Sequence, residues 1–139
     1  MEWMLLPLKR YAEFSGRSRP REYWMYVLFL FLCMIGLTIV ESMFGLGISD
    51  EWAYRNGWIL EAGASHQGGP LIGLFALCAF IPLLAVAVRR LHDSDRSGWW
   101  LLLAFLPLIG ALWLFILMII GGTRGPNRFG LDPVEHPPF

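Results

Sequence analysis

Charged residues are scarce in this sequence, and lysine is almost absent. Only 16% of the 139 residues are charged, whereas 56% are hydrophobic and the mean hydropathy is +0.53. In soluble domains about a quarter of the residues are charged. The single core of a soluble chain of this length could not bury so much apolar surface. The composition therefore excludes an ordinary soluble domain and favours a lipid bilayer as the solvent. The formal net charge of zero argues against nucleic-acid binding as the main task.

Cysteine is also rare, and its two positions carry no pattern. Cys33 and Cys78 both fall inside apolar runs, with neither a Cys-x-x-Cys motif nor a neighbouring histidine. Such a pair makes neither a disulfide framework nor a zinc site. We therefore expect both cysteines to be small apolar residues, and the sequence predicts no metal and no cofactor.

Three long apolar segments predict an all-α membrane protein. A transmembrane helix needs about 20 residues, and we expect three of them, at about 23–43, 71–88 and 99–120. Glu41 then lies near the far interface, as an interfacial carboxylate. The segment 49–70 between the first two spans reads as a polar loop.

The two ends of the chain differ from these spans. Apolar and basic residues alternate irregularly over 1–14, which predicts a helix lying in the membrane interface. We expect one polytopic membrane domain over 1–133, followed by a disordered tail at 134–139.

Pro107 and Gly110 interrupt the centre of the third apolar segment. A single kinked helix is the preferred interpretation, because two halves of about ten residues are too short to cross ~30 Å of hydrocarbon. A re-entrant pair of short helices is the alternative. It changes the side on which the C-terminus lies, which is outside after three full spans and inside after a re-entrant segment.

Positive charge predicts the orientation. Residues 1–22 hold five Lys and Arg, loop 49–70 one, loop 89–98 three and the tail two. The N-terminus and loop 89–98 share one side, and the positive-inside rule assigns that side to the cytoplasm.

The loop Arg89–Trp100 carries the densest chemistry, and three interpretations of it stay open. In the first, Arg89 and Arg90 cap the second helix, and Trp99 anchors the third at the interface. In the second, the arginines of this side form a pocket for anionic lipid headgroups, because planar guanidinium groups suit phosphate and ten of the 11 cations are Arg. The pocket residues are Arg17, Arg19, Arg21, Arg89, Arg90 and Arg96.

The third interpretation is catalysis on a membrane substrate. His92 and Asp93 could form an acid–base pair, or could bind a metal together with Asp95. Adjacent residues generally point in different directions, and no second cluster completes a metal sphere. A subunit of an oligomeric transporter or pore is a further alternative, although no acidic relay crosses the bilayer. The working prediction is a non-enzymatic module whose cytoplasmic arginines contact anionic headgroups or a partner protein, with a homo-oligomer as one form of partner.

Four polar motifs occur along the chain in a fixed order. They lie at Phe14–Trp24, Arg89–Trp100, Pro107–Gly110 and Gly125–Pro133. With these motifs the chain resembles the domain of unknown function 805 family, small bacterial inner-membrane proteins of the YhaH type. The resemblance covers roughly residues 3–133 and implies a bacterial inner-membrane location, but it implies no activity. It leaves open the roles of Glu22, Trp24, His92, Asp93, Trp99, Asn127, Arg128 and Asp132.

Overall fold

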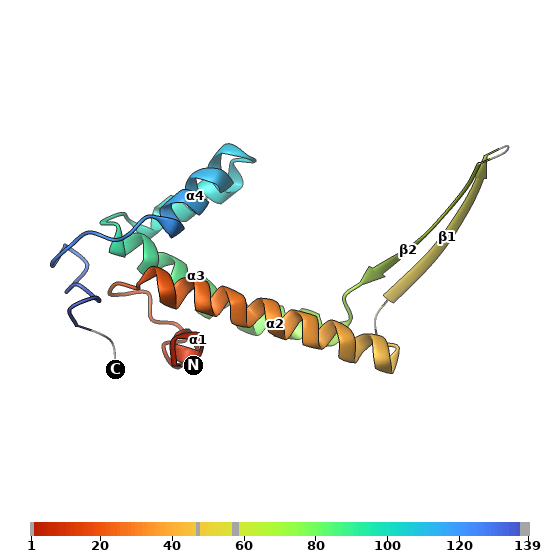
Figure 1. Cartoon of the computed structure of the whole chain (residues 1–139), viewed down its shortest axis with the longest axis horizontal. Coiled ribbons are helices and arrows are strands. Elements are labelled where there is room, and N and C mark those ends of the chain that lie inside the picture. Colours follow the sequence, from red (N-terminus) through yellow and green to blue (C-terminus); the bar gives the residue numbers. More distant parts are fainter. Residues whose placement is uncertain (1, 47, 57–58, 137–139) are drawn as a thin grey trace. The chain divides into compact units, whose positions relative to one another are not determined.

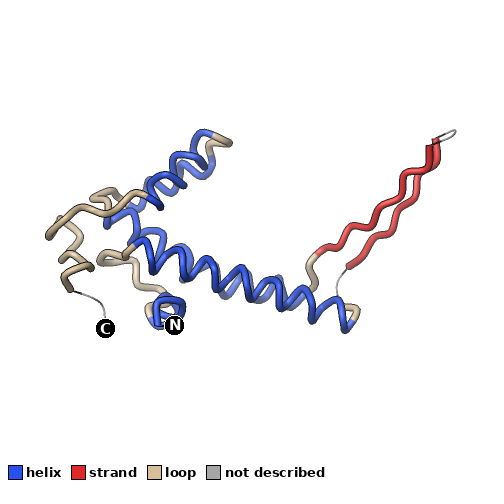
Figure 2. Tube along the Cα trace, in the orientation of Figure 1, coloured by secondary structure: helices blue, strands red, loops and turns tan. Residues whose placement is uncertain are grey.

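The structure, a computed structural model, describes residues 2–46, 48–56 and 59–136. Figures 1 and 2 trace its elements along the chain. The chain divides into two units, one made of Met1–Leu30 with Ala79–Phe139 and the other of Phe31–Cys78. The predicted membrane domain over 1–133 stays a prediction. Within the described residues, the elements are α1 (Glu2–Lys9), α2 (Pro20–Phe44), β1 (Ile48–Asn56), β2 (Ile59–Gln67), α3 (Pro70–Asp93), the 3-10 helix η1 (Gly98–Phe105) and α4 (Ile109–Ile119).

Helices α2 and α3 contain the first two predicted spans. They have 25 and 24 residues, and both are long and apolar enough to cross a membrane. At 1.5 Å per residue each is about 36 Å long, more than the ~30 Å hydrocarbon core. Many large apolar side chains of α2 are exposed, Phe31, Leu32 and Ile39 among them. These two helices agree with the sequence analysis, whereas the predicted all-α class does not hold for the segment between them, which forms two strands.

The third predicted span, 99–120, is not one helix, so that prediction was wrong. Helix η1 ends before Leu106, whose extended backbone (φ −87°, ψ 108°) is the conformation that a following proline favours. Leu108 then takes a positive φ of 62°, and α4 runs back against η1. Each helix is about 16 Å long, too short to cross a bilayer.

Close packing stabilises this η1–α4 hairpin. A Cβ on Gly110 would lie only 1.8 Å from the carbonyl oxygen of Leu103, so the two helices touch where no side chain stands between them. Leu117 and Met118 of α4 form a buried cluster with Leu91 of α3. The hairpin is the re-entrant alternative in its backbone path, and both of its ends lie near the end of α3.

The segment predicted as a polar loop over 49–70 is largely a β-hairpin. Strands β1 and β2 pair antiparallel from Ile48 with Gln67 to Asn56 with Ile59. The sequence signal was Gly57 at the first position of the two-residue connection 57–58, because glycine at that position favours a hairpin turn. We missed it because the segment is polar and rich in glycine.

Glu41 is a buried helix cap rather than a free carboxylate. Its Oε2 accepts a hydrogen bond from the backbone N–H of Gly69 at 2.7 Å, and its Oε1 accepts from Leu71 and Ile72 at 2.8 and 3.0 Å. These are orphan donors at the start of α3, where a negative charge also meets the positive end of the helix dipole. Glu41 therefore connects the end of α2 to the start of α3 within the second unit.

The predictions for the two ends of the chain have different outcomes. The helix expected within 1–14 is confirmed as α1, although it ends at Lys9. Its place in the membrane interface stays a prediction. Of the tail predicted to be disordered over 134–139, residues 134–136 lie in a turn where the N–H of His136 donates to the carbonyl of Asp132 at 2.9 Å, and residues 137–139 lie outside the described residues.

Candidate functional site

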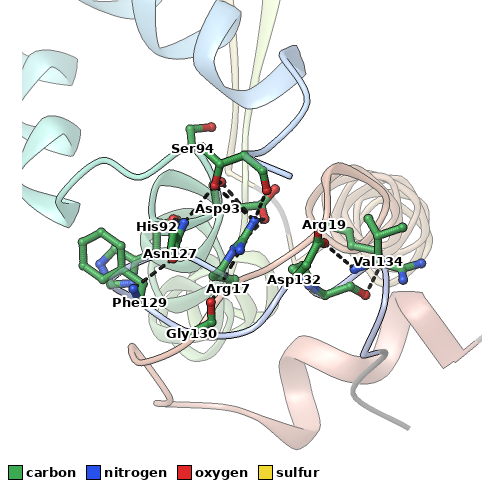
Figure 3. A network of polar contacts seen from close by, with 12 residues as sticks. Arg17, Arg19, His92, Asp93, Ser94, Asn127, Phe129, Gly130, Asp132 and Val134 are labelled. Atoms are coloured by element: carbon green, nitrogen blue, oxygen red, sulfur yellow. Dashed lines mark hydrogen bonds and ion pairs between the residues drawn. The ribbon is translucent and has the colours of Figure 1, made fainter. Parts of the chain in front are cut away.

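Three segments that are distant in the sequence meet at the end of α3. The segment 10–19 between α1 and α2, called the arm below, joins it where the N–H of Ser18 donates to the carbonyl of Arg89, at 3.1 Å. The segment that follows α4, residues 121–136, is called the tail below. It joins the end of α3 where the N–H of Thr123 donates to the carbonyl of Asp93, at 2.8 Å. Figure 3 shows the polar side chains gathered at this junction. We call Arg17, Arg90 and Asp93 the Asp93 cluster.

Arg17 ties the arm to both other segments. Its guanidinium donates to Asp93 Oδ1 at 3.0 Å and to the carbonyl oxygens of Thr123 and Gly125 at 2.5 and 2.6 Å. The side chain is buried, and a guanidinium brings five donors in a fixed plane. One arginine thus satisfies a carboxylate and two tail carbonyls at once.

Arg90 approaches Asp93 from the helix itself. Its Nη1 donates to Asp93 Oδ2 at 3.0 Å, so each carboxylate oxygen accepts from a different arginine. The same guanidinium donates to the carbonyl of Met118, at 3.3 Å, and to that of Ile120. These carbonyls end α4, where a cation satisfies orphan acceptors and meets the negative end of the helix dipole.

Gly122 lets the tail pass directly over this carboxylate. A Cβ on Gly122 would lie 2.0 Å from Asp93 Oδ2, closer than any side chain can come. The neighbouring Gly121 has open space at the same position. Only residue 122 therefore requires glycine for contact with the Asp93 cluster.

Arg89 faces the other way, toward α2. Its guanidinium lies 3.1 Å from the carboxylate of Glu22, and both side chains are fully buried. Among the described residues, none accepts a well-aligned hydrogen bond from the side-chain nitrogens of Arg89. The Arg89–Glu22 pair is thus held by charge alone.

His92 anchors the tail through its ring. The imidazole stacks on Phe129, with the ring centroids 3.9 Å apart and the planes inclined by 3°. Its Nδ1 lies 3.2 Å from the carbonyl oxygen of Gly16, which makes this nitrogen the donor. Asn127 donates to the His92 carbonyl at 2.9 Å and accepts from the N–H of Phe129, which closes the turn.

Asp132 organises the last turn through backbone groups. Its carboxylate accepts from the N–H of Val134 at 2.8 Å and from that of Gly125 at 2.9 Å. These hydrogen bonds, that of Val134 first, lower the pKa of Asp132 below its ordinary value. Nearby, Arg19 donates to the carbonyl of Pro133 at 2.5 Å.

Known proteins share this sequence over most of its length. A family model described as protein of unknown function (DUF805) matches residues 11–131. The chain is 41% identical over 133 residues to the inner membrane protein YhaI of Escherichia coli K12, with 96% of each chain covered. It is 40% identical over 137 residues to the inner membrane protein YhaH of the same strain, covering 99% of this chain and all of the relative. The chain belongs to the DUF805 family.

The resemblance drawn from four motifs is therefore confirmed. The uncharacterized protein YiiR of the same strain is more distant, 25% identical over 145 residues, with 86% of this chain and 85% of the relative covered. No solved structure matches the chain. With relatives named inner membrane proteins and two membrane-capable helices, this DUF805 protein is a membrane protein of unknown activity.

The structure divides the six predicted headgroup arginines into two groups. Arg17, Arg89 and Arg90 are buried in internal contacts. Arg19 is half-buried with its Cζ 5.5 Å from the Trp3 ring, Arg21 is exposed, and Arg96 lies 4.6 Å over the Trp100 ring.

The motif residues of unknown role also divide into buried and exposed ones. Glu22, Trp24, His92, Asp93, Asn127 and Asp132 contact neighbouring segments, Arg128 pairs with Asp95 at the surface, and Trp99 is 78% exposed.

His92 and Asp93 do not face each other. His92 contacts Gly16 and Phe129, whereas Asp93 contacts Arg17 and Arg90. Among the described residues, no group of three or more His, Cys, Asp or Glu lies close enough to hold a metal ion. The geometry therefore offers no acid–base pair at these two positions.

Sequence reasoning missed a pocket beside the Asp93 cluster. Its volume is about 390 Å³, and Arg19, Arg124, Asp132 and Glu135 line it together with Gly121 and Gly122. No local sequence signal marks Arg124 or Glu135. The sequence also does not specify on which side of the membrane the C-terminal segment lies. The contact between Thr123 and Asp93 brings them to this pocket.

Proposed function

We propose that this DUF805 protein is a multi-pass inner-membrane module, without catalytic activity of its own, whose cytoplasmic end binds anionic lipid headgroups. Helices α2 and α3 cross the bilayer, and the η1–α4 hairpin enters it and returns to the same side. The observation that carries the proposal is the meeting of the arm, the end of α3 and the tail at the Asp93 cluster.

Charge distribution supports this topology. With a re-entrant hairpin the tail lies on the same side as the N-terminus and loop 89–98, so every one of the 11 cations except Arg55 lies on that side. Three full spans would instead leave Arg124 and Arg128 outside. The positive-inside rule therefore favours the re-entrant topology and a cytoplasmic N-terminus.

The arginines have two tasks in this proposal. Arg17, Arg89 and Arg90 make internal contacts and hold the three segments together. The headgroup contacts then fall to the cations at the surface of the same junction, which are three of the predicted arginines together with Arg124 and Arg128. Planar guanidinium groups bind phosphate oxygens in pairs. The surface cations are Arg19, Arg21, Arg96, Arg124 and Arg128.

The topology is tested with alkaline phosphatase fusions, since this enzyme is active only outside the cytoplasm. We expect a fusion after Phe139 to be inactive and an insertion between β1 and β2 to be active. An active fusion after Phe139 would contradict the re-entrant topology.

Lipid binding is tested by native mass spectrometry of the whole chain, released from mild detergent after incubation with an equimolar mixture of phosphatidylglycerol and phosphatidylcholine. We expect preferential retention of phosphatidylglycerol. Arg21→Gln should lower that preference about fivefold, because one cation near an anionic surface is worth about 1 kcal/mol. Arg55→Gln is the matched control, since it removes the same charge from the opposite side. An equal effect of both changes, or no preference in the unaltered chain, would contradict the proposal.

A further inference from the structure

We propose that the pocket between Arg19, Arg124 and Glu135 binds a phosphate that carries an ammonium group, as in phosphoethanolamine. The inference rests on the proposed function, because it names the headgroup that one part of the cytoplasmic end selects. It follows from three charged side chains that line the pocket. Arg124 and Glu135 have no partner among the described residues, and Arg19 contacts the Pro133 carbonyl through Nε and lies near the Trp3 ring.

Two guanidinium groups are available for the phosphate. The Nε of Arg19 donates to the Pro133 carbonyl, which fixes the side chain, and no acceptor among the described residues engages its two terminal nitrogens. Arg124 is exposed and makes no polar contact with the described residues. The pocket also includes Pro20, the first residue of α2, where the positive end of a helix dipole favours an anion.

One carboxylate is available for the ammonium. Asp93 accepts from Arg17 and Arg90, and Asp132 accepts from two backbone N–H groups. Glu135 lines the same pocket, and no described residue pairs with it. All three carboxylates oppose a purely anionic headgroup, because their negative potential adds to that of the ligand.

The size of the pocket suits such a ligand. Its volume of about 390 Å³ falls within the ~300–1,000 Å³ of small-molecule sites. Gly121 and Gly122 line part of it without side chains, which leaves room beside the Asp93 cluster. A diester phosphate between Arg19 and Arg124, with its ammonium on Glu135, would give each of these three side chains a group of opposite charge to contact.

The test is a competition between phosphatidylethanolamine and phosphatidylglycerol with identical acyl chains, read by native mass spectrometry of the whole chain. The surface arginines outside the pocket favour phosphatidylglycerol, so the ratio of retained phosphatidylethanolamine to phosphatidylglycerol in the unaltered chain is the reference. Glu135→Gln should lower that ratio about tenfold, as expected for the loss of one charge-assisted hydrogen bond. Arg19→Gln with Arg124→Gln should lower the retention of both lipids. Glu61→Gln is the matched control, since Glu61 lies in β2 and does not line the pocket, and it should leave the ratio unchanged.

The outcomes separate this inference from the function on which it rests. A ratio that Glu135→Gln does not lower would overturn the inference and leave headgroup binding intact. Retention of neither lipid would overturn both. Soluble O-phosphoethanolamine, added alone to the delipidated chain, distinguishes the two sources of this chemistry. Its binding would support a free ligand, and binding of the diacyl form alone would support a membrane lipid.

Discussion

Arg89 and Arg90 are neighbours on α3, both fully buried, and their surroundings differ sharply. Arg90 donates to the Asp93 carboxylate and to the last carbonyls of α4, and Asp93 is shared with Arg17. Arg89 has only the charge of Glu22, and its nitrogens have no hydrogen-bond acceptor among the described residues. Two equally buried arginines therefore have different roles. Arg90 connects α3 to the end of α4 and shares Asp93 with Arg17, whereas Arg89 connects α3 to α2 through Glu22.

The difference predicts how each site responds to change. Burying a charge is costly, and attraction offsets that cost only when hydrogen bonds satisfy the remaining donors. The Asp93 cluster meets this condition, whereas the Arg89–Glu22 pair does not. The first should be hard to replace, and the second should be replaceable by apolar residues.

Asp93→Ala should have the largest effect. It leaves Arg17 and Arg90 buried without a counter-ion, and removing one member of a buried pair costs about 3–5 kcal/mol. Thermal unfolding in mild detergent measures the loss, and faster tryptic cleavage at Arg124 and Arg128 reports release of the tail. Glu22→Ala, the matched change at the other pair, strands only Arg89 and should cost less. An equal or larger loss for Glu22→Ala would contradict the comparison.

Apolar double replacements should separate the two pairs most clearly. Glu22→Leu with Arg89→Met should be at least as stable as the unaltered chain, because poorly satisfied buried pairs often gain about 1–4 kcal/mol on such replacement. Asp93→Leu with Arg90→Met should be much less stable, because Arg17 and the α4 carbonyls then lose their partners. Thermal unfolding of both double variants tests this. If both double variants were destabilised equally, the lack of hydrogen bonds around Arg89 would make no difference to the free energy of unfolding.

Gly122→Ala should have a smaller effect on the same cluster. The added methyl group would displace the Asp93 carboxylate from its two arginines, and overpacking of this kind costs about 1–3 kcal/mol. Gly121→Ala is the neighbouring control, because open space surrounds that position. The same measurements of unfolding and tail cleavage apply. Equal effects at the two glycines would mean that the tail does not pass over Asp93 as described.

Helices α2 and α3, on one hand, and the turn between η1 and α4, on the other, differ in how far the sequence predicts them. Runs of about 20 apolar residues specify α2 and α3, because their length alone matches the bilayer. Pro107 and Gly110 marked a break in the third segment, but a break alone does not say whether the chain turns back. That depends on contacts distant in sequence, such as those of Arg90 with the end of α4.

The site was predictable to a similar extent. Charge segregation indicated that arginines gather at one side, and the residue type indicated phosphate chemistry. The sequence does not show which arginines make contacts within the protein. Arg17, for example, donates to the carbonyls of Thr123 and Gly125, which are more than a hundred residues away. The pocket at Arg124 and Glu135 depends on the same long-range contact.

Asp132 extends the comparison to a carboxylate whose hydrogen bonds come from backbone N–H groups, and its effect should be the smallest. Because its hydrogen bonds lower its pKa in the folded chain, its contribution to stability is complete above the ordinary pKa of 3.8 and is lost as the pH falls through the folded value. Acidification below about pH 4 should therefore loosen the turn. Hydrogen exchange of the Gly125 and Val134 amides, corrected for intrinsic rates, measures this loss of protection. Asp132→Asn cannot titrate, so the same acid transition in that variant would assign the loosening to another group.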